Sequence, residues 1–130
     1  MDSQTERRFR FVKAARTEEV PQGTFKAVRL EEFDLILTNW EGSFYCFRNR
    51  CPHQHNSLEG AKVWDGMLEC PWHHFRYNLR TGENLYPRNV YPQDEPRLQE
   101  QLHPLDPYPL RVIRGEILVG LPTSYPSDSP

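Results

Sequence analysis

Two short segments, CPHQH and CPWHH, constrain the fold more than any other feature of this chain of 130 residues. They contain the patterns Cys51-x-His53 and Cys70-x-x-His73, with sixteen residues between the two patterns and an Asp-Gly hairpin signal within that spacer. Loops that follow neighbouring strands can converge, so the spacing predicts two thiolates and two imidazoles at one metal centre. Chance would have to explain both cysteines, both histidines and the proline after each cysteine.

The rest of the chain consists of short runs of alternating apolar and β-forming residues, interrupted by turns that contain glycine. Turns are expected at Glu41-Gly42, Asp65-Gly66 and Arg114-Gly115. No segment has the apolar stripe of a helix longer than about two turns. The pattern therefore predicts an all-β domain, with strands at 8–14, 24–30, 34–40, 43–49, 61–64, 67–70, 75–79, 108–113 and 116–121.

Composition excludes several classes of protein. The formal net charge is -2, with acidic and basic residues interspersed, which argues against a nucleic-acid-binding protein. No apolar run approaches the length of a membrane helix. The N-terminal segment MDSQTERRFRF is polar and lacks the apolar core of a secretory signal, so we expect a cytoplasmic protein.

The three cysteines are too few for a disulfide framework, and in a reducing compartment they favour metal ligation or burial. Cys46 lies in the strand-like run SFYCFR, on the same face as Phe44. We interpret Cys46 as a small buried apolar residue, with a reactive thiol as the lesser alternative.

The length predicts a single domain over residues 1–121. Within it we expect metal-binding loops at 49–60 and 70–77. Nine of the twelve prolines follow Tyr86, and they predict a long extended loop at 86–109. Residues 122–130 are expected to be a disordered tail.

The Cys/His pattern resembles that of the Rieske [2Fe–2S] proteins, whose signature is C-x-H, a spacer and C-x-x-H. The segments CPHQHNSLEG and ECPWHHFRYNLRTGE match this signature at all four ligand positions. The resemblance runs from about Phe9 to Leu121. It implies that Cys51 and Cys70 bind one iron of a single [2Fe–2S] cluster and that His53 and His73 bind the other. It also implies a β-sandwich-like domain with a small cluster-binding subdomain.

Other residues near the signature are assigned supporting roles. His55 and His74 stand where relatives often have glycine or a small residue, and we expect them in the second shell or at the surface. With Trp72, they would form part of a docking tip for partners. His103 is interpreted as an ordinary exposed residue.

The resemblance also carries an expectation for the reduction potential. Rieske proteins of cytochrome bc complexes have an extra cysteine in each loop, and a serine and a tyrosine at the positions of Phe75 and Tyr77. Phe75 cannot donate a hydrogen bond to a sulfide. Tyr77 either donates to a ligand sulfur or packs in the core, and the sequence leaves both open. We therefore expect a cluster whose potential is low for a Rieske centre.

A centre with filled coordination sites suits electron transfer rather than catalysis. The chain resembles free-standing Rieske-type ferredoxins, which implies a carrier that passes single electrons from a flavin-dependent reductase to a terminal oxygenase or another redox enzyme. One alternative is a subunit of a larger reductase, such as the small subunit of a nitrite reductase. Another is a structural zinc module, because two thiolates and two imidazoles also suit tetrahedral zinc.

Overall fold

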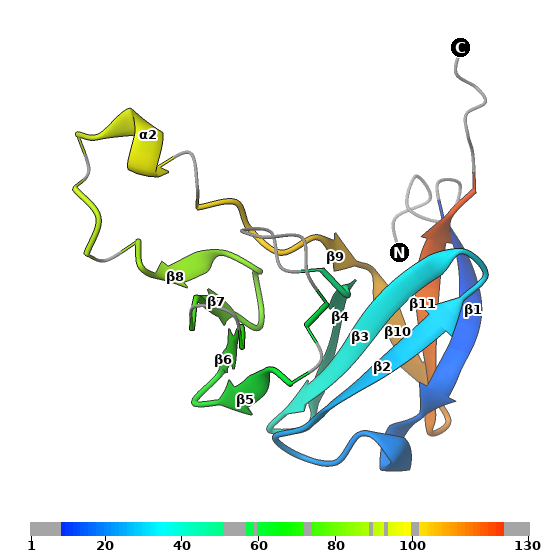
Figure 1. Cartoon of the computed structure of the whole chain (residues 1–130). Coiled ribbons are helices and arrows are strands. Elements are labelled where there is room, and N and C mark those ends of the chain that lie inside the picture. Colours follow the sequence, from blue (N-terminus) through cyan, green and yellow to red (C-terminus); the bar gives the residue numbers. More distant parts are fainter. Residues whose placement is uncertain are drawn as a thin grey trace.

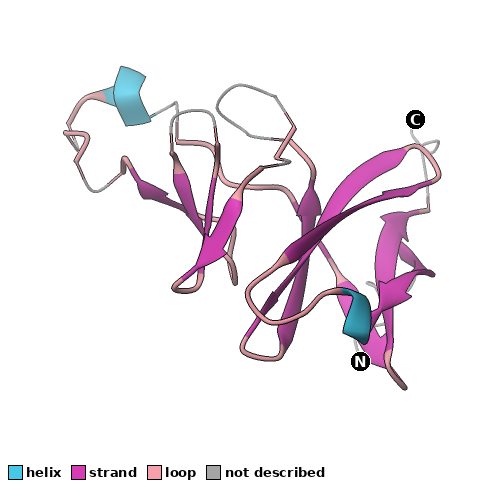
Figure 2. Cartoon of the chain, turned by 60° about the horizontal axis from the view of Figure 1, so that its bottom comes forward, coloured by secondary structure: helices cyan, strands magenta, loops and turns pink. Residues whose placement is uncertain are grey.

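The computed structural model describes residues 9–50, 57–58, 60–71, 74–88, 90–92, 94–99 and 102–123. These residues form three antiparallel sheets, which lie side by side in Figures 1 and 2. The outer sheet has the strand order β1-β11-β10, the middle sheet β2-β3-β4-β9 and the small sheet β5-β6-β7-β8. The strands are β1 (Phe9–Arg16), β2 (Phe25–Leu30), β3 (Phe33–Trp40), β4 (Ser43–Arg48), β5 (Lys62–Trp64), β6 (Met67–Glu69), β7 (Arg76–Asn78), β8 (Asn84–Tyr86), β9 (Pro107–Tyr108), β10 (Leu110–Ile113) and β11 (Glu116–Pro122).

The all-β prediction is confirmed. Among the described residues, helix is confined to a 3-10 turn at Thr17–Glu19 and to α2 (Pro96–Gln99). None of these is long and apolar enough to span a membrane.

The middle sheet is covered on both faces. All five residues from Leu35 to Asn39 are buried, which distinguishes β3 from a strand with one solvated face. Leu35 and Leu37 pack with residues of the outer sheet in one core, together with Cys46. Ile36 belongs to the other core, which contains residues of the small sheet. The middle sheet therefore connects a two-sheet sandwich to the small sheet.

The predicted turns form as expected. Asp65 (φ 50°) and Gly66 (φ 73°) both adopt left-handed conformations between β5 and β6, as a two-residue hairpin turn requires. The turn between β2 and β3 has Glu31 at φ 58° and contains no glycine, so the sequence pattern did not reveal it.

Two strand predictions differ from the structure. The run 108–113 was expected to be one strand, but it divides at Pro109 into β9, which pairs with β4, and β10, which pairs with β11. Proline has no amide hydrogen for a ladder, so it marks the transfer between sheets. The short strand β8, which pairs with β7, was not expected.

The proline-rich segment was expected to be extended, but the structure gives it one turn of helix, α2, as Figure 1 shows. Leu105 anchors the segment to the small-sheet core, where it is 1% exposed. Its amide donates to the Gly82 carbonyl over 2.8 Å.

Cys46 is buried, as expected, in the sandwich core that Phe44 partly covers. Burial raises the pKa of its thiol to about 12. A thiol that keeps its proton is a poor nucleophile, so the structure favours the packing role over a reactive one.

Candidate metal centre

The second Cys/His loop begins where β6 ends and finishes where β7 begins. Leu68 pairs with Tyr77 and Glu69 with Arg76 across these two strands. The Cys70 amide then donates to the Phe75 carbonyl over 2.7 Å, so one further hydrogen bond closes the loop. The Cys70 side chain is buried, with 1% of its surface exposed. The hairpin therefore holds one sulfur in a fixed and dry position.

The first Cys/His loop follows β4 and is closed by a side chain. The carboxamide oxygen Oδ1 of Asn49 accepts a hydrogen bond of 2.7 Å from the Leu58 amide and one of 3.4 Å from the Ser57 hydroxyl. Asn49 thus joins the chain before the loop to the chain after it. Sequence reasoning missed this residue, although an asparagine directly after a strand is a common source of such loop-closing hydrogen bonds.

The described ends of the two loops lie together. A β-carbon placed on Gly60 would lie 3.8 Å from the Cβ and Cγ atoms of Pro71, the residue after Cys70. Leu58 and Ala61 from the first loop share one buried core with Cys70 and Phe75 from the second. The described ends of the two loops therefore meet on the core that contains Cys70.

The structure places some of the predicted site residues and not others. Cys51, His53, His55, Trp72 and His73 lie outside the described residues. Cys70, His74 and Tyr77 are described. Among the described residues, no group of three or more His, Cys, Asp or Glu is arranged to hold a metal. The donor set present in the sequence, two cysteines and two histidines, fits a Rieske-type [2Fe–2S] cluster.

His74 is exposed, and its side chain turns toward the small sheet. Its Nδ1 lies 2.8 Å from Oε2 of Glu69, and its backbone has φ 60°. A left-handed conformation is costly for a residue with a β-carbon, and the contact with Glu69 offsets part of that cost. Glu69 is therefore a supporting residue that the sequence reasoning did not identify.

The Glu69 carboxylate is the centre of a polar cluster on the small sheet. It accepts a hydrogen bond of 2.9 Å from Nε1 of Trp64 and lies 3.4 Å from Nε of Arg76. Burial alone would raise the pKa of the carboxyl group. The hydrogen bonds from Trp64 and His74 and the charge of Arg76 outweigh burial and hold that pKa below its ordinary value.

Arg76 in turn contacts two aromatic rings. Its guanidinium carbon is 5.2 Å from the ring centroid of Trp64 and 5.2 Å from that of Tyr86. These two cation–π contacts help to hold the positive charge next to Glu69. Glu69, directly before the second loop, and His74, within it, are therefore linked to the small sheet.

Tyr77 and Phe75 face the interior at the base of the second loop. They are 1% and 6% exposed, and both belong to the core that contains Cys70. Phe75 presents no donor to this region, as the sequence predicted. The ring of Tyr77 packs in the core, while the hydrogen bond of its hydroxyl to a sulfur stays a prediction.

Comparisons with known proteins identify the family of this chain. The family model of the Rieske [2Fe-2S] domain matches residues 10–95. The ferredoxin subunit of 3-phenylpropionate/cinnamic acid dioxygenase from Escherichia coli K12 is 34% identical over 110 residues, which cover 83% of this chain and 91% of the relative. The ferredoxin component of the alkene monooxygenase system from Xanthobacter autotrophicus is 28% identical over 111 residues, covering 85% of this chain and 80% of the relative.

The fold also has a counterpart among solved structures. The ferredoxin of carbazole 1,9a-dioxygenase from Nocardioides aromaticivorans IC177 matches with a TM-score of 0.69 at 23% sequence identity. The match covers 87% of this chain and 98% of that ferredoxin.

Proposed function

Because this chain belongs to the Rieske [2Fe-2S] domain family, we propose that Cys51 and Cys70 bind one iron of its cluster and that His53 and His73 bind the other. Members of the family hold one [2Fe–2S] cluster, and the relatives are ferredoxin components of oxygenase systems. The chain is accordingly an electron carrier and not itself a catalyst. The observation that supports the ligand assignment best is the buried position of Cys70 at the closed end of the β6–β7 hairpin.

Held by these four residues, the cluster would supply one-electron transfer. The protein around it excludes water on the side of Cys70 and Phe75, where Leu58 and Tyr77 complete the buried wall. Two neutral imidazoles in place of two thiolates make the cluster less negative, which raises its potential above that of an all-cysteine cluster. Phe75 supplies no hydrogen bond to a sulfide, so we place the potential at the low end of the Rieske range.

We also propose that the electron comes from a flavin-dependent reductase and goes to a terminal oxygenase, in the cytoplasm. The names of the relatives support this, since they are components of dioxygenase and monooxygenase systems. Solved structures with a similar fold include a complex of reduced oxygenase and oxidised ferredoxin. We further propose that residues 1–121 form a single domain, that residues 86–109 are a loop of this domain, and that residues 122–130 are a tail outside it.

Electron paramagnetic resonance of the dithionite-reduced protein tests the function, together with its iron and zinc content. We expect two irons per chain and a rhombic signal with an average g-value below that of an all-cysteine cluster. His73→Cys should shift the signal toward the all-cysteine type or abolish it. His74→Ala, at the neighbouring histidine, should leave it unchanged. A silent spectrum with one zinc per chain would refute the electron-carrier assignment.

A further inference from the structure

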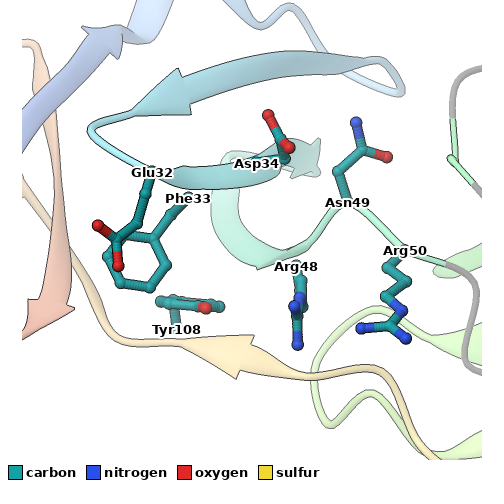
Figure 3. Close-up of a pocket in the computed structure, with 7 residues that line it drawn as sticks. All are labelled: Glu32, Phe33, Asp34, Arg48, Asn49, Arg50 and Tyr108. Atoms are coloured by element: carbon teal, nitrogen blue, oxygen red, sulfur yellow. The ribbon is translucent and has the colours of Figure 1, made fainter. Parts of the chain in front are cut away.

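A polar cavity of about 250 Å³ lies at the end of the middle sheet, directly before the first Cys/His loop. Figure 3 shows its lining residues, which come from the β2–β3 turn, from β3, from the end of β4 and from β9. Arg48, Arg50 and Tyr108 form the part of this cavity that we call the arginine notch. Arg50 directly precedes Cys51 in the chain.

The backbone turns both arginines to the same side. The Arg50 amide donates to the Arg48 carbonyl over 2.8 Å, which makes a tight three-residue turn. The Arg48 amide is held by the Asp106 carbonyl, also at 2.8 Å. In Figure 3 the two guanidinium groups point the same way, whereas the side chains of Asp34 and Asn49 point the opposite way. The notch is thus a preformed pair of cations.

These cations are only weakly neutralised. The Arg48 guanidinium is 3.9 Å from the Asp106 carboxylate, and both side chains are about half exposed or more, so the pair contributes little. Within the described part of the chain, Arg50 has no ion pair. The nearby Asp34 carboxylate is already bound by Arg29, at 2.9 and 3.1 Å. The notch therefore has positive charge available for a ligand.

Tyr108 adds a hydroxyl group and a rigid wall. Its ring packs edge-to-face on Phe33, with ring centroids 6.1 Å apart. Burial raises the pKa of Tyr108, although the charge of Arg48 opposes the shift. The phenol consequently stays protonated in neutral solution and can act as a hydrogen-bond donor.

We propose that the arginine notch binds a carboxylate on an acidic segment of the redox partner protein. Guanidinium groups form paired hydrogen bonds to carboxylates, and a cationic site beside the cluster loops would orient an acidic partner at the correct end of the molecule. Two carboxylates, Glu32 and Asp34, also belong to the cavity lining, but Asp34 is bound by Arg29 and points away from the two guanidinium groups. This proposal deepens the electron-carrier function and rests on it.

The test is a titration of the oxidised, iron-loaded protein with the capped peptide Gly-Glu-Asp-Glu-Gly, followed by NMR of the arginine side chains and the Tyr108 amide. We expect saturable shifts at Arg48, Arg50 and Tyr108, which disappear as salt rises to about 0.3 M. Arg50→Glu should weaken the affinity about tenfold or more at low salt. Arg48→Glu should do the same, and it covers the case in which the change beside Cys51 prevents cluster insertion.

Arg114→Glu is the matched control, because it makes the same change of charge in the β10–β11 turn, where Arg114 is exposed. Its affinity should stay within about twofold of the unchanged protein. Equal loss of affinity in all three variants, shifts outside the notch, or an equal response to inorganic phosphate would overturn the proposal. The electron paramagnetic resonance signal of the cluster is measured separately. A notch that does not bind the peptide is therefore distinguishable from a protein that carries no cluster.

Discussion

Glu69 contacts three side chains of the small sheet and the second loop through its carboxylate. It precedes Cys70 in the chain, and its carboxylate holds Trp64 and His74 through hydrogen bonds of 2.9 and 2.8 Å. A fixed negative charge next to the cluster opposes the arrival of an electron. We therefore expect Glu69→Gln to raise the reduction potential by on the order of tens of millivolts. Protein-film voltammetry measures this directly.

The control for Glu69 is Glu83→Gln, which removes an exposed carboxylate from the same part of the chain. It should leave the potential within experimental error. An equal shift in the two variants would mean that net charge, and not the Glu69 contact, determines the effect.

Tyr77 offers a second test at the residue scale. If its hydroxyl donates to a sulfur, Tyr77→Phe removes a stabiliser of the reduced cluster. We expect the potential to fall by roughly tens of millivolts, with the protein still folded because the ring keeps its place in the core. An unchanged potential would assign Tyr77 a packing role only.

Cys46 provides a prediction for pH. Its pKa of about 12 in the folded protein lies above the ordinary thiol value near 8.5, so the folded state keeps a proton that the unfolded state loses. Its contribution to the free energy of unfolding is fully present below about pH 8.5 and falls as pH rises toward 12. We expect iodoacetamide at about pH 8.5 to leave Cys46 unmodified in the native protein and to modify it in urea. Mass spectrometry of tryptic peptides checks this, and modification of native Cys46 would contradict the burial.

Among the elements, the loop after β4 has its described ends joined by the side chain of Asn49. Asn49→Ala removes the acceptor of the Leu58 amide and leaves that buried end of the loop unsatisfied, which costs about 1–3 kcal/mol. We expect less iron per chain and faster bleaching of the visible absorption. Asn49→Asp keeps an acceptor oxygen and should restore most of the iron. Bleaching at the original rate in the alanine variant would show that the loop does not need this closure.

The elements also show how far sequence reasoning extends. Hairpins with an Asp-Gly or Glu-Gly turn were predicted because glycine accepts the left-handed conformation that such turns require. The Glu31 turn and β8 were missed because their formation depends on tertiary pairing. The same holds at the candidate centre. The cysteines and histidines are recognisable by their spacing. Asn49 and Glu69 acquire their roles only when a loop or hairpin closes and brings their partners into contact. The arginine notch forms only when Tyr108 of β9 reaches the end of β4.

At the scale of the whole molecule, the middle sheet contributes side chains to both cores. Phe47 lies in the core that also contains Cys70. Its Cε1 atom is 3.3 Å from where a β-carbon on Gly82 would lie. Leu37 lies in the sandwich core. Phe47→Leu and Leu37→Val each remove buried apolar volume and should lower the free energy of unfolding by about 1–2 kcal/mol.

The two variants should nevertheless differ in how they hold iron. A cavity beside Phe47 loosens the core that contains Cys70, so Phe47→Leu should release iron to a chelator several-fold faster at temperatures where both variants are folded. Leu37→Val changes the far side of the sheet and should release iron at the original rate. Visible circular dichroism follows the iron, and urea unfolding gives the stability. Equal release rates at equal stability would mean that the three sheets open as one unit, because only global unfolding would then expose the cluster.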